Sequence, residues 1–116
     1  MSYDLDFWKY KDGICLDHQD VYERLSNGEE VDGLETLPIP EMLGAVEREF
    51  STDWMHDDEE TWESDDRGCF QTFTTAQFFR VDCYGMEDGD MNRLINVALS
   101  FGCPLYDPQA GKRYDG

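Results

Sequence analysis

Apolar and polar residues alternate at the start of the chain, where Tyr3, Leu5 and Phe7 are separated by polar residues. This period of two is typical of a strand with one buried face, so we expect a strand over residues 2–10. A second short alternation over residues 61–64 predicts an edge strand. Both segments therefore belong to a sheet that buries one side.

Residues 69–75 and 77–84 are rich in aromatic and β-branched residues and are separated by a very short gap. That composition favours strands, and the short gap favours a hairpin. A turn is expected over residues 65–68, which hold two acids and a glycine. Residues 103–108 predict a short extended piece, followed by a polar tail.

The next pattern is helical. Asp17 is a suitable N-cap, Val21 and Leu25 fall on one helical face, and Asn27 followed by Gly28 is a common helix end. This segment predicts a short first helix.

Two further segments have amphipathic spacing. The first of them predicts the second helix of the chain, with Pro40 near its start and its end near Phe50. The other predicts the third helix, with Asp90 as its N-cap and its end at Gly102. The apolar residues that form the two stripes are Ile39, Met42, Leu43, Val46 and Phe50, and then Met91, Leu94, Ile95, Ala98 and Leu99.

The order of these elements is strand, helix, helix, three strands, helix, short strand. We expect an α+β fold, a two-layer sandwich in which a mostly antiparallel sheet carries about three helices on one face. A length of 116 residues fits a single domain, which we place over residues 1–116.

Composition supports a folded chain despite its charge. The AVILMFWYC residues make up 40% and the aromatic residues 14%, although the net charge is -18. No signal peptide is visible at the start, and the charge-free run over residues 94–106 is too short to span a bilayer. We expect a soluble, cytoplasmic protein.

The charge also narrows the class of partner. Nine Lys and Arg residues are scattered among twenty-seven acids, which argues against nucleic acid and anionic membranes as direct ligands. The cysteines show no C-x-x-C spacing, so reduced cysteines packed in the interior are expected rather than structural zinc. Their positions are Cys15, Cys69, Cys83 and Cys103.

Catalysis finds little support in the sequence. No pair of carboxylates is marked by contrasting surroundings, and His18 and His56 are expected to be exposed polar residues. No nucleophile elbow, phosphate-binding loop or H-E-x-x-H motif occurs. The acids over residues 53–60 and 88–90 lack the ligand spacing of an EF-hand. We therefore expect no enzyme activity, no cofactor and no dedicated metal site.

The strongest functional signal is an acidic run. Residues 53–66 hold eight carboxylates, no Lys or Arg, and two tryptophans, Trp54 and Trp62. Residues 29–66 hold fifteen acids against the single base Arg48. Such a density destabilises the compact state by self-repulsion and is easiest to understand as a surface that attracts a positive partner.

We expect the acids to provide electrostatic complementarity and the tryptophans to serve as anchors. The expected binding residues are Trp54, Asp57, Asp58, Glu59, Glu60, Trp62, Glu63, Asp65 and Asp66. The simpler interpretation stays open: charge runs are usually solvated faces, and Trp62 could be a core residue.

Four short sequence segments are the basis of a resemblance to a known family: MSYDL at 1–5, FRVDCYG at 79–85, MNRLI at 91–95 and CPLYDPQ at 103–109. Together they resemble small, acidic bacterial immunity proteins of polymorphic or contact-dependent growth-inhibition toxin systems. The resemblance implies an immunity-protein-like domain that binds a cognate toxin domain and blocks its active site or an essential surface. It transfers no binding residues, because the contact surface varies between such pairs.

We therefore expect a non-enzymatic inhibitor of a cationic toxin domain, with a nuclease as the expected toxin. The alternatives are an acidic adaptor or nucleic-acid mimic that binds a basic host protein, and a small carboxylate-dependent enzyme.

Overall fold

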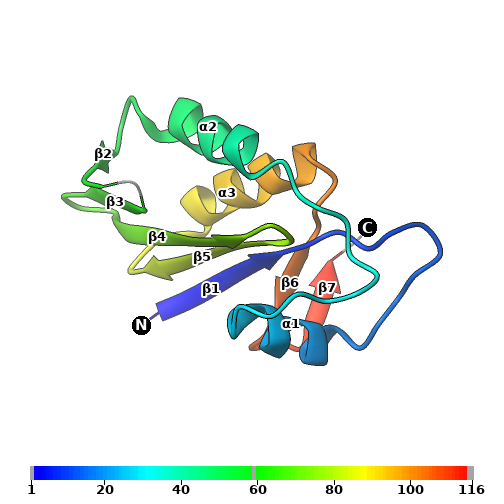
Figure 1. The fold of residues 1–116 in the computed structure, drawn as a ribbon. Coiled ribbons are helices and arrows are strands. Elements are labelled where there is room, and N and C mark those ends of the chain that lie inside the picture. Colours follow the sequence, from blue (N-terminus) through cyan, green and yellow to red (C-terminus); the bar gives the residue numbers. More distant parts are fainter. Residues whose placement is uncertain (1, 59, 115–116) are drawn as a thin grey trace.

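A computed structural model describes residues 2–58 and 60–114, and within them the strands form one antiparallel sheet (Figure 1). The strand order is β2-β3-β4-β5-β1-β6-β7. The strands are β1 (Ser2–Phe7), β2 (Met55–His56), β3 (Thr61–Ser64), β4 (Gly68–Thr75), β5 (Phe78–Tyr84), β6 (Leu105–Asp107) and β7 (Lys112–Tyr114). The helices are α1 (His18–Ser26), α2 (Ile39–Phe50) and α3 (Asp88–Ser100). The expected α+β fold with an antiparallel sheet is confirmed.

The first strand lies inside the sheet, between β5 and β6. Its alternating pattern buries Leu5 and Phe7 on one side of the sheet, and the strand pairs along both edges. The expected hairpin is also present: β4 and β5 pair from Cys69 opposite Tyr84 to Thr75 opposite Phe78.

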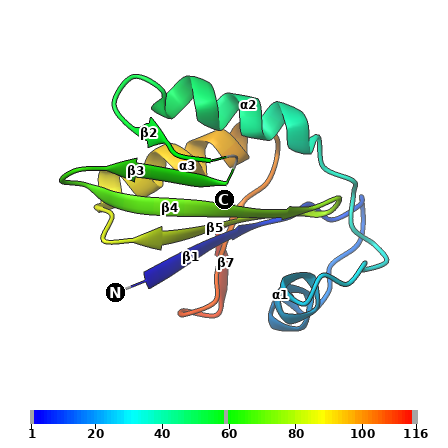
Figure 2. The same ribbon diagram turned by 60° about the vertical axis from the view of Figure 1, so that its left-hand side comes forward.

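Helices α2 and α3 lie side by side over one face of this sheet (Figure 2). Their apolar stripes meet the strand residues in one core, which explains why both helices are amphipathic. The largest fully buried members of this core include Leu5, Phe7, Met42, Phe50, Phe70, Phe79 and Leu94.

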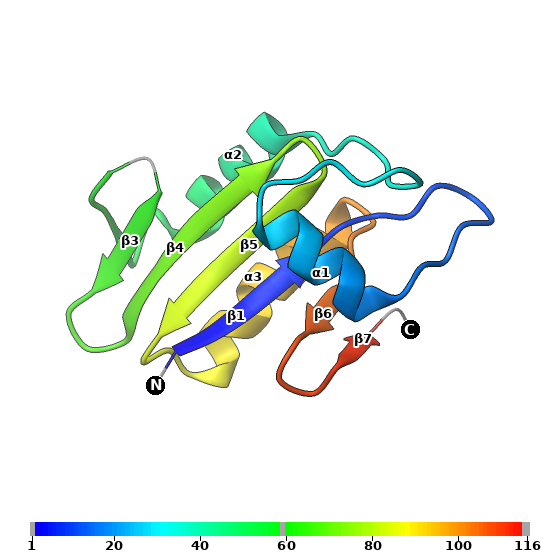
Figure 3. The ribbon, with the colours of Figure 1, turned by 60° about the horizontal axis from the view of Figure 1, so that its bottom comes forward.

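The first helix differs from the expectation that all helices share one face. Figure 3 shows α1 in front of the face that α2 and α3 do not cover. Val21 and Leu25 of α1 pack there in a second core with Trp8, Phe78 and Tyr106. An amphipathic stripe specifies that a helix is buried, but the large aromatic residues on this face determine where α1 is buried.

The N-cap predicted from the sequence is found in α1 but not in α3. Asp17 caps α1 as expected, because its carboxylate accepts a hydrogen bond from the Asp20 backbone N–H at 3.1 Å. Helix α3 begins earlier than expected, with Glu87 as the N-cap residue. Asp90 therefore lies inside the first turn of α3, where its carboxylate is available for other partners.

The expected polar tail forms β7, which pairs with β6 and lies at one edge of the sheet. None of the helices within the described residues is long and apolar enough to cross a membrane.

Candidate functional site

Strands β2 and β3 form a short hairpin at the other edge of the sheet. Met55 lies opposite Glu63, and His56 lies opposite Trp62. The turn between the strands is closed by Asp58, whose carboxylate accepts hydrogen bonds from the backbone N–H groups of residues 60 and 61, both at 2.9 Å. The residues expected to form an edge strand thus form β3. The edge strand itself is β2, and β3 lies between β2 and β4.

Both tryptophans of the acidic run are buried: Trp54 is 5% exposed and Trp62 is 3% exposed. Trp62 pairs with Phe70 on the helix-covered face, and the His56 ring stacks on it with ring centroids 4.0 Å apart. Trp54 contacts Phe50 and Phe70 in the same core. Neither side chain has the exposure that an anchor for a partner requires. The alternative that Trp62 is a core residue is the one that the structure supports.

The carboxylates of the run behave differently and remain at the surface. Six of those expected to bind a partner are exposed, and none of them joins the ion pairs formed by the described residues. We call these six the acidic edge: Asp57, Asp58, Glu60, Glu63, Asp65 and Asp66. Glu59, also expected to bind, lies outside the described residues.

The acidic edge is crowded enough to perturb ionisation. The Asp57 carboxylate raises the pKa of Glu63, and Asp65 adds to this effect. The side chains of Asp57 and Glu63 share a hydrogen bond, and like charges in close proximity disfavour ionisation of one another. None of these three carboxylates takes part in an ion pair among the described residues. A positive group placed beside Glu63 would remove this repulsion. The edge is therefore suited to a cation that another molecule supplies.

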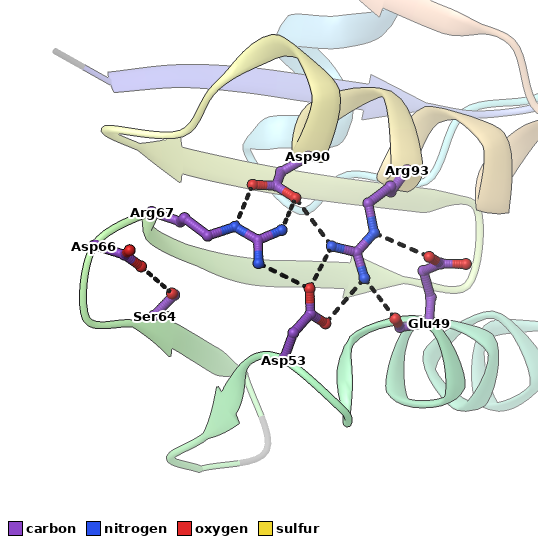
Figure 4. A network of polar contacts seen from close by, with 7 residues as sticks. All are labelled: Glu49, Asp53, Ser64, Asp66, Arg67, Asp90 and Arg93. Atoms are coloured by element: carbon purple, nitrogen blue, oxygen red, sulfur yellow. Dashed lines mark hydrogen bonds and ion pairs between the residues drawn. The ribbon is translucent and has the colours of Figure 1, made fainter.

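One acid of the run, Asp53, is already engaged by bases of this chain and is not available to a cation from another molecule. Asp53 is engaged by two arginines, Arg67 from the β3–β4 turn and Arg93 from α3 (Figure 4). Both guanidinium groups donate to Asp53 at 2.9 Å. These contacts lower the pKa of Asp53, with Arg93 as the main cause. Asp53 thus belongs to the scaffold and not to the acidic edge.

Asp90 completes this network. Its carboxylate receives two hydrogen bonds from Arg67 and one from Arg93, and the pKa of Asp90 is lowered, chiefly by Arg67. Arg93 also donates to the side chain of Glu49 at 2.9 Å and to its backbone carbonyl at 2.7 Å. The network joins α2, α3 and the two segments that flank the acidic edge, so it holds that edge in place.

A hollow of about 460 Å³ opens beside the acidic edge. Its lining residues include Asp53, Trp54, Met55, Glu63, Asp65 and Asp66. Met55 is 66% exposed, so an apolar side chain projects among the carboxylates. The hollow thus combines negative charge with an accessible apolar contact.

Met55 also belongs to a row across the sheet. It lies opposite Glu63, which lies opposite Cys69, which lies opposite Tyr84. Paired residues of antiparallel strands share a face, and this row faces away from α2 and α3. Figure 3 shows that α1 leaves β3 and β4 uncovered on this side. We call the uncovered area over β3, β4 and the adjoining end of β5 the open face, and Tyr84 at that end of β5 is 40% exposed.

The cysteines and His18 lie outside the acidic edge in the sequence. The four cysteines are free thiols, of which Cys83 and Cys103 are buried as expected, whereas Cys15 is exposed and Cys69 is half-buried. Nδ1 of His18 lies 2.7 Å from the Tyr10 hydroxyl. Within residues 2–58 and 60–114, no His, Cys, Asp and Glu side chains gather in a group that could hold a metal ion.

The chain matches no known protein family, no curated protein and no solved structure. Sequence reasoning missed Met55 and Tyr84 as exposed apolar contacts and Arg67 and Arg93 as the braces of the acidic edge. The three-residue spacing of Asp90 and Arg93 on one helix was the only local signal for the network.

Proposed function

We propose that this protein is a non-enzymatic immunity protein that binds and neutralises a cognate cationic toxin domain, with a nuclease as the expected toxin. The observation that carries the proposal is the acidic edge: six exposed carboxylates without ion pairs among the described residues, on the braced β2–β3 hairpin and the turn that follows it. Basic groups that normally hold phosphates would find comparable negative partners on this edge. Binding there would cover the toxin's own nucleic-acid site.

Association and retention would depend on different groups. The carboxylates would attract the toxin at long range and raise the rate of encounter. Met55 and Tyr84, which are exposed on the open face beside the edge, replace Trp54 and Trp62 as the proposed anchors. Burial of such apolar side chains at the centre of an interface slows dissociation.

The proposal is tested by capture of the partner with two variants of equal charge. In the edge variant, Asp57→Asn, Glu63→Gln and Asp65→Asn remove three carboxylates from the acidic edge. The control variant removes three exposed carboxylates outside the run, through Glu23→Gln, Glu30→Gln and Asp32→Asn. Each immobilised protein is incubated at low salt with an extract of the cells that make it, and retained proteins are identified by mass spectrometry.

We expect the wild-type protein and the control variant to retain a basic protein that the edge variant retains at least about 10-fold less. The purified basic protein should have a toxic activity, such as nucleic-acid cleavage, that stoichiometric wild-type protein abolishes. Retention of a basic host protein without such activity would favour the adaptor alternative. Equal retention by the two variants would exclude the acidic edge as the binding surface.

A further inference from the structure

Helix α1 is a short element that depends on the sheet for its stability. It has nine residues, of which Val21 and Leu25 are buried. A helix of this length is marginal in water on its own. The connections on either side of it, over residues 8–17 and 27–38, contribute no strand to the sheet. The helix could therefore leave the sheet without breaking any strand pairing.

A buried acid lies under α1. Asp6 of β1 is completely buried on the sheet face that α1 covers (Figure 3). Its carboxyl oxygens accept no hydrogen bond from an N–H group of the described residues, and its side-chain partner is the carboxylate of Asp4. Two carboxyl groups form a hydrogen bond only when one of them carries a proton. An ionised carboxylate without a donor is also strongly disfavoured in the interior. Asp6 and Asp4 therefore share a proton.

The neighbours of Asp6 are also the groups that hold α1 on the sheet. The Tyr22 hydroxyl of α1 donates to the carboxylate of Asp4 at 2.9 Å. Arg80, which lies opposite Asp6 on β5, donates to the Ser26 hydroxyl at the end of α1 at 3.1 Å. Two polar contacts between α1 and the sheet thus involve residues adjacent to the shared proton.

Loss of the shared proton would place a second negative charge in this cluster. The titratable groups around Asp6 come from four elements and are Asp4 on β1, Arg80 and Asp82 on β5, Tyr22 on α1 and Tyr106 on β6. Arg80 is the one base in this set, and it already donates to Asp82 at 2.9 Å and lies 3.8 Å from Asp4. The new charge would repel the other carboxylates and compete with Ser26 for Arg80. Both effects weaken the attachment of α1.

We propose that α1 is a proton-dependent latch, which stays on the sheet while Asp6 and Asp4 share a proton and leaves it as a unit when that proton is lost. The latch would open towards alkaline pH, before the rest of the protein unfolds. The inference does not depend on the proposed function of the acidic edge.

Opening of the latch would change the surface of the protein. The residues that α1 covers include the aromatic side chains of Trp8, Phe78 and Tyr106. The Phe78 ring lies 6.3 Å from the ring of Phe73 on β4, measured between centroids, and Phe73 is 40% exposed. The uncovered aromatic residues would therefore extend the apolar part of the open face.

The test is hydrogen exchange of backbone amides in the full-length protein labelled with ¹⁵N, followed by NMR between pH 6 and pH 8 and at low concentrations of urea. Each rate is expressed as a protection factor relative to an unfolded chain at the same pH. Amides of residues 21–26 report on α1, and those of residues 46–50 report on α2. Asp6→Asn removes the titration. His18→Gln is the control, because His18 is a titratable residue at the start of α1, where its protonation would weaken the helix towards low pH instead.

We expect the protection factors of α1 to be at least about 10-fold lower than those of α2 and to respond less to urea, because opening of α1 exposes less surface than global unfolding. They should fall about 10-fold per pH unit in the wild-type protein and in His18→Gln, and stay constant in Asp6→Asn. Equal protection and equal urea dependence of the two helices would overturn the latch, and this comparison needs no variant. A fall with pH that persists in Asp6→Asn would also overturn it.

Discussion

Asp6 is an acid buried completely on the sheet face that α1 covers. Neither of its carboxyl oxygens accepts a hydrogen bond from an N–H group of the described residues, and its one side-chain partner is the carboxylate of Asp4. Arg80, the residue opposite it on β5, donates to Asp82 and to Ser26 instead. Burial, reinforced by the neighbouring Asp4 carboxylate, raises the pKa of Asp6 to about 9. Asp6 is therefore protonated in the folded protein at neutral pH.

This protonation predicts a pH dependence of stability. The folded-state pKa lies above the unfolded-state value of 3.8, so the folded protein keeps a proton that the unfolded chain loses. The contribution of Asp6 to stability is complete below that unfolded value and is lost as the pH rises to the folded-state pKa. Its slope is about 1.4 kcal/mol per pH unit, or about 2 to 3 kcal/mol between pH 6 and pH 8.

Asp6→Asn removes this titration and keeps the shape of the side chain. Urea unfolding at pH 6 and at pH 8 should show that the wild-type protein loses about 2 to 3 kcal/mol more stability over this interval than the variant. Parallel losses in the two proteins would mean that Asp6 is ionised in the folded state.

Single residues also show where sequence reasoning failed. Trp54 and Trp62 stand among charges in the sequence, which made them candidate anchors, yet both are buried. The face of β3 that Trp62 occupies depends on its pairing with Phe70, and this register is not visible in the local pattern. The exposure of Met55 has the same origin, because it depends on pairing with Glu63.

At the scale of elements, the acidic edge depends on the turn between β3 and β4. Gly68 ends this turn with a φ of +95°, a conformation that other residues adopt only with strain. A Cβ atom at this position would lie 2.2 Å from the Tyr84 carbonyl oxygen and 2.8 Å from the carbonyl carbon of Gly85. The close approach of β5 to this turn therefore requires glycine.

Gly68→Ala should destabilise the protein by at least about 3 kcal/mol, because backbone strain and a clash with β5 add together. Gly28→Ala is the matched control, since Gly28 has a φ of +81° but open space around its Cβ position. It should cost only about 1 kcal/mol. Urea unfolding measures both, and equal losses would show that the turn can move away from β5.

The longer elements were predictable from sequence because their patterns are strong. The hairpin of β4 and β5 and the stripes of α2 and α3 are found where expected, and β1 is present but ends at Phe7 instead of residue 10. The short strands β2 and β7 were missed, since two or three residues carry no periodic signal. The face on which α1 packs was also beyond local reasoning, because it is determined by aromatic residues from three separate strands or strand ends.

At the scale of the whole molecule, the charge is unevenly distributed. The acidic edge lies at the β2–β3 end of the sheet, and β6 and β7 form the other end (Figures 1 and 3). The concentration of acids over residues 29–66 was apparent from the sequence, but the neutralisation of Asp53 was not. Arg93 lies 40 positions away from Asp53 in the chain, and only the packing of α3 against α2 brings them together.

The acidic edge should control how fast the partner arrives. Attraction between exposed charges is screened by salt, whereas apolar contacts made after encounter are not. The rate of association is therefore the quantity that reports on the edge most directly, and the rate of dissociation reports on Met55 and Tyr84.

The decisive measurement is the association rate constant of the purified basic partner, determined by stopped-flow fluorescence at about 20 and about 150 mM salt. For the wild-type protein we predict a fall of at least about 10-fold between these conditions. For the variant with Asp57→Asn, Glu63→Gln and Asp65→Asn, we predict a slower rate at low salt and a much smaller fall. A wild-type rate that does not change with salt, or equal salt dependence in the two proteins, would contradict the central claim that the acidic edge recruits a cationic partner.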